Sequence, residues 1–210
     1  MSKTKSKQTK SDQPGERFTD RFDKAYYDRF YRNSSTRAVS PAQCRRQAAF
    51  IASYLRYLEL PVKRIVDLGC GLGRTLDALG EAFPKASLTG VEVSDYLCQK
   101  YGWVNADILG FQPRARFDLV VCNDVLGYLN NPDCGAAIDH IAGLCRGAAF
   151  IGVPTTEDWD QCDPDRTDQE QQLRSTAWYR RRLSKHFVCI GGGLYLKKPV
   201  EVNVWALDSL

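Results

Sequence analysis

The chain has 210 residues, of which 43% are hydrophobic and 26% charged, as is typical of one soluble globular domain with a sizeable core. No window approaches the roughly 18 unbroken apolar residues of a membrane helix, and the charged N-terminus lacks the apolar core of a secretory signal, so we expect a cytoplasmic protein without membrane contact. The lysines among the first ten residues account for the whole net charge of +4, which leaves the rest neutral and disfavours nucleic acid as a partner.

The first predicted elements are helical. We expect residues 1–16 to be a disordered basic arm. Residues 17–32 carry an aromatic side chain at every fourth position, which indicates a helix. These aromatic residues are Phe18, Phe22, Tyr26 and Phe30. Ser40 is a suitable N-cap with Pro41 at the first helical position, and it predicts a second helix that runs to about Leu58.

From residue 64 onward, short apolar runs alternate with helical patterns. The predicted strands are 64–69, 87–93, 103–108, 117–124 and 148–154. The predicted helices are 73–83, Ser94 to Gly102, Asn131 (as N-cap) to Gly147, and 175–187. Two further strands, 193–198 and 200–207, close the chain as a hairpin. The sequence therefore predicts a doubly wound α/β fold: a mostly parallel seven-stranded sheet with an antiparallel last strand, helices on both faces and extra N-terminal helices.

The turn after the first strand reads "VDLGCGLG" and has a glycine at every second position. Glycines allow unusual dihedrals and let a ligand approach the backbone closely. The nicotinamide fingerprint needs a third glycine where this chain has Arg74, so a dinucleotide oxidoreductase is the least favoured reading. An acid, Asp67, precedes the first glycine by two residues.

Four motifs in order, "VDLGCGLG", "VEVS", "NADI" and "FDLVVCNDVLGYL", carry a family likeness. Together they resemble the class I S-adenosylmethionine-dependent methyltransferases over about residues 64–154. The resemblance implies S-adenosylmethionine as cofactor and S-adenosylhomocysteine as product. The cofactor-binding residues that it implies are Asp67, Gly69, Cys70, Gly71, Glu92, Val93, Asp107, Ile108, Asn123 and Asp124.

The resemblance also gives these residues roles. The glycines lie against the methionine portion of the cofactor, and Asp67 holds its ammonium group. Glu92 accepts hydrogen bonds from the ribose hydroxyls, whereas Asp107 accepts from the adenine amino group beside Ile108. Plainer readings stay open, because Asp107 could form an Asx turn and the Asn123–Asp124 pair could cap a helix.

Methyl transfer from a sulfonium is an in-line displacement, so it needs a general base only where the acceptor is protonated. Glu157 and Asp158 follow the fifth strand directly and are our acid/base candidates, with a solvated loop as the alternative. Asp124, His140 and His186 are weaker candidates.

Aromatic residues supply a candidate lid and acceptor pocket, with ordinary packing as the alternative. They are Tyr26, Tyr27, Tyr31, Tyr128, Trp159 and Trp178. The eight cysteines contain no CxxC pair, so we expect buried thiols and no metal site.

The acceptor class follows by elimination. The Asn/Asp-Pro-Pro-aromatic tetrad of base and glutamine methylases is missing after the fourth strand, where residues 123–126 read "NDVL". We therefore expect methylation of a small molecule at oxygen or nitrogen. An RNA or protein methyltransferase that uses the basic arm and Arg180–Arg182, or a non-catalytic cofactor-binding or scaffolding module, are the alternatives.

The domain division predicted from these patterns has one folded unit, residues 17–210, after the basic arm. Residues 17–60 form an N-terminal helical cap and 61–154 the cofactor-binding core. Residues 155–210 hold an acceptor-side insertion and the closing hairpin. The sequence does not define an oligomeric state.

Overall fold

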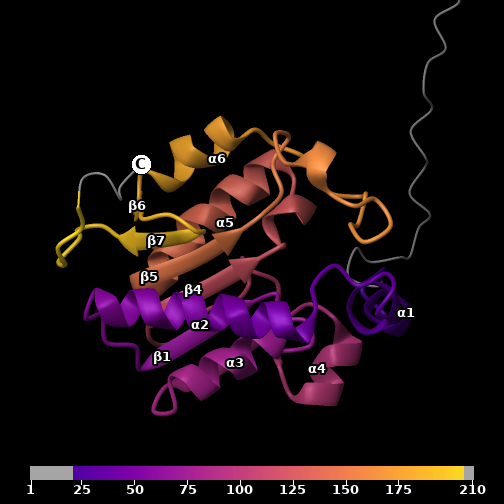
Figure 1. Cartoon of the computed structure of the whole chain (residues 1–210), viewed down its shortest axis with the longest axis horizontal. Coiled ribbons are helices and arrows are strands. Elements are labelled where there is room, and N and C mark those ends of the chain that lie inside the picture. Colours follow the sequence, from indigo (N-terminus) through magenta and orange to yellow (C-terminus); the bar gives the residue numbers. More distant parts are fainter. Residues whose placement is uncertain (1–20, 206–210) are drawn as a thin grey trace, which may run out of the picture.

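The computed structural model describes residues 21–205, so the arm predicted for 1–16 lies outside the described residues. Seven strands form one sheet in the order β3-β2-β1-β4-β5-β7-β6 (Figure 1). The strands are β1 (Arg64–Leu68), β2 (Ser87–Glu92), β3 (Val104–Asn105), β4 (Phe117–Asn123), β5 (Cys145–Gly152), β6 (Phe187–Cys189) and β7 (Leu194–Lys197). Strands β1 to β5 pair in parallel, whereas β7 is antiparallel to β5 and β6. The predicted fold class is confirmed.

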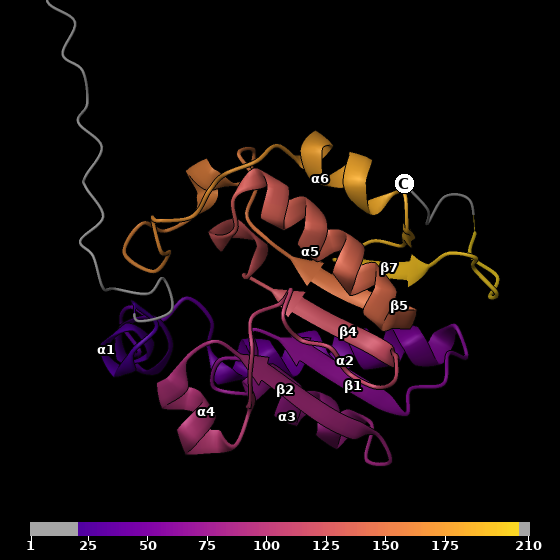
Figure 2. The same cartoon turned by 180° about the vertical axis from the view of Figure 1, so that it is seen from behind.

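Helices cover both faces of this sheet. The α-helices are α1 (Lys24–Tyr27), α2 (Pro41–Tyr57), α3 (Arg74–Ala82), α4 (Asp95–Tyr101), α5 (Asn131–Leu144) and α6 (Thr176–Leu183). Helices α2 and α3 lie in front of the sheet in the view of Figure 1, and α5 lies in front of it in the reverse view of Figure 2. Successive strand side chains point to opposite faces, so Ile65 packs with α2 and α3 whereas Val66 packs with α5 and α6.

Local capping explains where two helices begin. Ser40 and Gln43 form a capping box at the start of α2, with Pro41 in the first turn. Ser94 caps α4, and Gly102 ends it in the left-handed conformation. Both boundaries are as predicted.

The N-terminal helix and the third strand differ from their predicted extents. The helix expected over 17–32 is observed as α1 followed by a π-helix, η2 (Asp28–Arg32), while residues 17–20 lie outside the described residues. Strand β3 has only two residues because Asp107 turns the chain: its Oδ1 accepts from the N–H groups of Leu109 and Gly110.

The predicted limits of α5 were wrong at both ends. The N-cap is Asn130, whose side chain accepts from the N–H of Asp133, so Asn131 is already helical. The helix ends at Leu144, and Cys145 starts β5 directly. Residues 145–147 belong to the strand because Cys145 pairs with Phe117 in β4.

The two strands of the closing hairpin were predicted too far along the sequence. The observed hairpin consists of β6 and β7, joined through the glycines at 191–193. Helix α6 was expected to continue to Phe187, but Phe187 pairs with Lys197 in the sheet. The strand expected over 200–207 is not formed as far as Trp205, and residues 206 and 207 lie outside the described residues.

The arrowhead of β4 points toward the side of the molecule where α1 lies (Figures 1 and 2). Because β1, β2 and β3 run parallel to β4, their carboxyl ends lie at the same side. Strand β1 lies between β2 and β4, so the strand order reverses beside it. Open α/β sheets bind ligands at this place. Among residues 21–205, no helix is long and apolar enough to cross a membrane.

Asp118 lies at the amino ends of the strands, on the side of the sheet opposite the site, and its contacts predict an effect on stability. Asp118, at the start of β4, accepts from the N–H groups of Lys63 and Arg64, each at 2.8 Å, and pairs with Arg146 at 2.6 Å. Asp118→Ala leaves two backbone donors without this acceptor. We expect the free energy of unfolding to fall by about 1–3 kcal/mol, as measured by urea denaturation at pH 7.

The same carboxylate gives this effect a pH dependence. Burial would raise the pKa of Asp118, but hydrogen bonds from Arg146 and the two backbone amides lower it overall. Its stabilisation is therefore present above the unfolded pKa of about 3.9 and is lost as pH falls through the lower folded pKa. Glu81→Ala, at an exposed carboxylate of α3, is the control. A loss in the control as large as that in Asp118→Ala would contradict the prediction.

Candidate functional site

The turn after β1 is held open by three glycines with positive φ. Gly69, Gly71 and Gly73 have φ of 75°, 53° and 76°. The N–H groups of Gly69 and Cys70 donate to the carbonyl of Val91 on β2, which fixes the turn against its neighbouring strand. A side chain is excluded at Gly69 because a Cβ there would lie under 3.0 Å from Val125.

Trp103 supports this turn from the other side. Its indole Nε1 donates to the carbonyl of Gly71 at 3.1 Å, and its ring covers Gly73 and Gly90. Sequence analysis missed Trp103, because nothing in the pattern of the third strand shows which glycines its ring will meet.

Glu92 ends β2 with a carboxylate that accepts four hydrogen bonds. Oε2 accepts from the N–H of Gly71 at 2.8 Å. Oε1 accepts from the N–H groups of Val93 and Ser94 and from the hydroxyl of Tyr27, at 2.8, 3.0 and 3.2 Å. This side chain is 3% exposed and joins three segments of the chain.

Asp67 is buried in a different way. It is 4% exposed, and none of the described residues donates a hydrogen bond to its carboxylate. Burial, followed by the charge of Glu92, raises the pKa of Asp67 to about 7. A buried carboxylate without a partner is costly, so this position suits a group that binds a cation.

The ends of β3 and β4 supply four more of the predicted residues. Oδ1 of Asp107 is used in the Asx turn described above, and Ile108 is buried beside it. Asn123 donates from its Nδ2 to Oδ2 of Asp124 at 2.8 Å. Asp124 has a φ of 58°, an unusual value for a residue other than glycine, and burial raises its pKa to about 6.

These strand ends enclose a cavity of about 350 Å³, which we call the main cavity. Its size is that of a small-molecule site. The predicted site residues that line it are Tyr26, Tyr27, Tyr31, Gly69, Gly71, Glu92, Val93, Asp107, Ile108, Asn123, Asp124 and Tyr128.

A smaller cavity of about 80 Å³, which we call the side cavity, adjoins the main cavity. Asp67, Cys70 and Arg74 line only the side cavity, whereas Asp124 and Tyr31 line both cavities. The two spaces therefore meet beside the glycine turn.

Segment 21–32, which we call the lid, covers the main cavity and is anchored to the strand ends. The hydroxyl of Ser94 donates to the carbonyl of Phe22 at 2.5 Å, and Tyr27 donates to Glu92 as described above. Arg74 donates to the carbonyl of Tyr31 at 2.9 Å. Thus the residue that breaks the dinucleotide fingerprint ties the lid to the start of α3.

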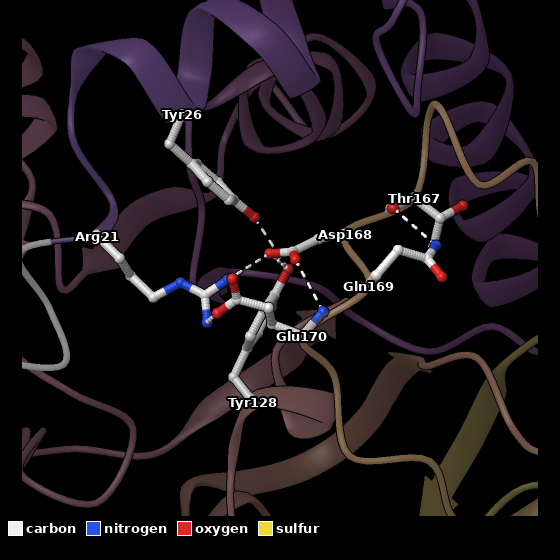
Figure 3. A network of polar contacts seen from close by, with 7 residues as sticks. All are labelled: Arg21, Tyr26, Tyr128, Thr167, Asp168, Gln169 and Glu170. Carbon is white, nitrogen blue, oxygen red and sulfur yellow. Dashed lines mark hydrogen bonds and ion pairs between the residues drawn. The ribbon is translucent and has the colours of Figure 1, made fainter. Parts of the chain in front are cut away.

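A polar network fastens the other side of the lid (Figure 3). Arg21 pairs with Asp168 at 2.8 Å and with Glu170 at 3.0 Å. The hydroxyl of Tyr128 donates to Asp168 at 3.1 Å and lies 2.9 Å from the hydroxyl of Tyr26. The network links the lid to the loop before α6. Sequence analysis did not single out Asp168, because it lies in a polar stretch with many similar acids.

Four predicted residues do not reach either cavity: Glu157, Asp158, Trp159 and Trp178. Glu157 accepts from the N–H of Thr176 at the start of α6, and this bond, the first of several, lowers the pKa of Glu157 to about 2. Asp158 accepts from the N–H and hydroxyl of Thr155. Both carboxylates thus serve local backbone structure. Trp178 stacks against the guanidinium of Arg182, 3.4 Å from its ring centroid.

Comparison with known proteins places this site in a family. A family model described as a methyltransferase domain matches residues 42–192. The chain belongs to the methyltransferase-domain family.

Curated relatives of this methyltransferase domain include trans-aconitate 2-methyltransferase of Escherichia coli strain SE11. The two sequences are 30% identical over 159 residues, which are 69% of this chain and 59% of that protein. The corresponding protein of Shigella flexneri serotype 5b is 30% identical over 161 residues, 70% of this chain and 60% of that one. The methyltransferase domain thus spans only 59% to 60% of the length of these relatives.

Solved structures share the fold of this methyltransferase domain. Magnesium protoporphyrin IX methyltransferase from Synechocystis PCC 6803, with bound SAH, is 19% identical with a TM-score of 0.61, covering 86% of this chain and 98% of that one. DesVI of Streptomyces venezuelae is 18% identical with a TM-score of 0.62, covering 85% and 99%. The fold is that of the class I methyltransferases.

The glycine turn of this methyltransferase domain gives a matched pair of variants. Gly69 and Gly102 have almost the same φ, 75° and 74°, but a Cβ at Gly102 would meet nothing within 4 Å. Alanine costs about 1 kcal/mol at either position for the left-handed backbone. Gly69→Ala adds a clash with Val125 that costs about 1–3 kcal/mol more. We therefore expect the larger fall in melting temperature for Gly69→Ala by calorimetry, and equal falls would contradict this view of the turn.

Proposed function

We propose that this domain binds S-adenosylmethionine and transfers its methyl group to oxygen or nitrogen of a small molecule. The observation that carries the proposal is Asp67, a buried carboxylate without a hydrogen-bond donor among residues 21–205, beside a glycine turn. Such a group is explained by a ligand that brings its own cation. The ammonium of the methionine moiety is such a cation.

The remaining polar groups fit the rest of the same molecule. Arg74 lines the side cavity together with Asp67 and Asp124, so this small space offers carboxylates and a guanidinium to an amino-acid headgroup. Glu92 can exchange the hydroxyl of Tyr27 for a ribose hydroxyl. Oδ1 of Asp107 is used in its turn, which leaves Oδ2 for an adenine amino group beside Ile108.

For methyl transfer, the main task of the protein is to position the acceptor relative to the methyl group. The bound sulfonium supplies an activated methyl group with a good leaving group. The residues of this chain then hold the acceptor in line with the methyl carbon and exclude water through the lid. The aromatic side chains of the lid suit this second task.

The competing acceptor classes have less support. Arg180 and Arg181 line a separate groove between α6 and β6 rather than the main cavity, so a nucleic acid bound there is not directed to the strand ends. The named substrate of the curated relatives, trans-aconitate, is a polycarboxylate. Among the described lining residues of the main cavity there is no lysine, arginine or histidine to hold one.

Calorimetric titration tests the cofactor. S-adenosylhomocysteine should bind the folded protein with a stoichiometry of one, whereas NADH should give no heat beyond dilution. Circular dichroism of the same sample shows that the protein is folded. A folded sample that does not bind S-adenosylhomocysteine would overturn the proposal.

Asp67→Asn should separate ligand binding from stability. The variant loses a charged contact to the ammonium, so we expect affinity for S-adenosylhomocysteine to fall about 10- to 100-fold. Its melting temperature should instead rise at pH 8. The folded pKa of Asp67, about 7, exceeds the unfolded value of about 3.9, so ionisation costs the wild type stability as pH rises between these values.

The control for this variant is Asp160→Asn, at an exposed carboxylate of the short helix η4 (Trp159–Gln161). It should change neither the affinity nor the melting temperature. If Asp67→Asn kept the wild-type affinity, Asp67 would not be the ammonium-binding residue.

A further inference from the structure

The main cavity is lined by acidic residues, although the chain beyond its first ten residues has no net charge. The charged residues that line it are Glu92, Asp107, Asp124 and Asp133, and the lining includes no basic residue among positions 21–205. The rings of Phe22, Tyr26, Tyr27, Tyr31 and Tyr128 form much of the remaining wall. Carboxylates and aromatic faces both favour a positive guest, the latter through the negative potential of the ring face.

The proposed cofactor uses only part of this wall. Its hydroxyls and adenine take Glu92 and Asp107, and its ammonium takes Asp67 in the side cavity. Asp124, which the resemblance assigned to the cofactor, and Asp133 then remain for the acceptor, together with the rings of Phe22, Tyr26 and Tyr128 in the same lining. Phe22 packs edge-on against Tyr128 with ring centroids 5.4 Å apart, so these rings form one surface.

Two arginines that bond to residues around the main cavity, Arg21 and Arg174, are held by other partners. Arg21 pairs with Asp168 and Glu170 (Figure 3). Its guanidinium also lies 5.1 Å from the ring centroid of Phe22 and 5.4 Å from that of Tyr128, so these rings already face one cation. Arg174 is 5% exposed and donates to the carbonyls of Leu126 and Leu129. Once the cofactor has taken Glu92 and Asp107, an anionic acceptor would meet Asp124 and Asp133, with no basic residue in the described lining of the main cavity.

We propose that the methyl acceptor is an amine, which enters as an ammonium ion between Asp124 and the rings of Phe22, Tyr26 and Tyr128 and is methylated on nitrogen. This rests on the proposed function, and it narrows the acceptor from oxygen or nitrogen to nitrogen. It also separates this domain from enzymes that methylate carboxylates.

Asp124 is suited to take the proton that the ammonium must lose. Its Oδ2 is held by Asn123, whereas Oδ1 accepts no hydrogen bond from the described residues. Burial raises the pKa of Asp124, which makes it a better proton acceptor than a solvated aspartate. Its position at both cavities places it where the methyl donor and the acceptor meet.

The step balances without a further reactant. The ammonium gives one proton to the Asp124 carboxylate and becomes a neutral amine. The nitrogen lone pair forms a bond to the methyl carbon while the carbon–sulfur bond breaks, and that electron pair stays on sulfur as the thioether of S-adenosylhomocysteine. The methylated ammonium product and the proton on Asp124 then leave to solvent.

Three probes of nearly the same shape test the charge preference. Choline, 3,3-dimethylbutan-1-ol and 3,3-dimethylbutanoate are a cation, a neutral molecule and an anion around one branched skeleton. Each is titrated to 50 mM into the protein saturated with S-adenosylhomocysteine, which lacks the sulfonium charge, and ligand-observed NMR measures binding. We expect choline to bind at least fivefold more tightly than the alcohol, and the anion to bind least.

Two sets of variants locate the binding. Asp124→Asn, which tolerates the left-handed backbone, should weaken choline at least fivefold, whereas Asp160→Asn should not. Tyr128→Leu should weaken choline, and Tyr128→Phe, which keeps the ring, should restore most of the affinity. If Asp124→Asn unfolds the protein, the Tyr128 pair still tests the aromatic half of the site.

The outcomes separate the two proposals. Binding of S-adenosylhomocysteine with no preference for choline, with no probe binding, or with the anion favoured overturns the amine acceptor and leaves the cofactor proposal standing. Failure of S-adenosylhomocysteine to bind overturns the proposed function itself. Methylation of trans-aconitate by the purified protein would also overturn the amine acceptor.

Discussion

The carboxylate of Glu92 is the contact on which the arrangement of the site depends. It joins the N–H of Gly71 in the glycine turn, the N–H groups at the start of α4 and the hydroxyl of Tyr27 in the lid. Four donors on one buried carboxylate offset the cost of burying its charge. The same bonds fix Tyr27 of the lid against β1 and β2, and the other lid contacts, Ser94 to Phe22 and Arg74 to Tyr31, hold the segment on either side of it. Ligand hydroxyls that replace Tyr27 would couple cofactor binding to the position of the lid.

Two other acids of the site, in contrast, accept few hydrogen bonds from the protein. Glu92 is saturated by donors, whereas Asp67 has none among the described residues and Asp124 has only Asn123. Their raised pKa values show that the fold bears an electrostatic cost at these two positions. Such a cost is expected where a site waits for a charge that arrives with the ligand. A saturated carboxylate shapes the cavity, and unsaturated carboxylates select what enters it.

Sequence patterns predicted most of the fold because most of it is encoded locally. The capping box of Ser40, the cap and stop of α4 at Ser94 and Gly102, and the apolar run of β4 each depend on neighbouring residues. The errors lie where distant pairing decided the outcome. Cys145 and Phe187 look helical by their neighbours, but β4 and β7 draw them into the sheet. The closing hairpin was misplaced for the same reason, since the apolar pattern after Lys198 reads as a strand but finds no partner as far as Trp205.

The site residues also fall into those that local sequence predicts and those that it does not. The residues at the ends of β1 to β4 could be anticipated, because parallel strands bring their carboxyl ends to one edge. Glu157 and Asp158 also follow a strand, yet Glu157 bonds the N–H of Thr176 at the start of α6 and Asp158 bonds Thr155 within the loop after β5. Strand order alone therefore does not place a side chain. Trp103 and Asp168 had no local signal at all. The clearest case is charge: outside its lysine-rich start the chain is neutral, yet the main cavity is lined by acids without a base among the described residues. Net charge averages over surfaces that a ligand never meets, and the preference of a site comes from the few charges that the fold turns inward.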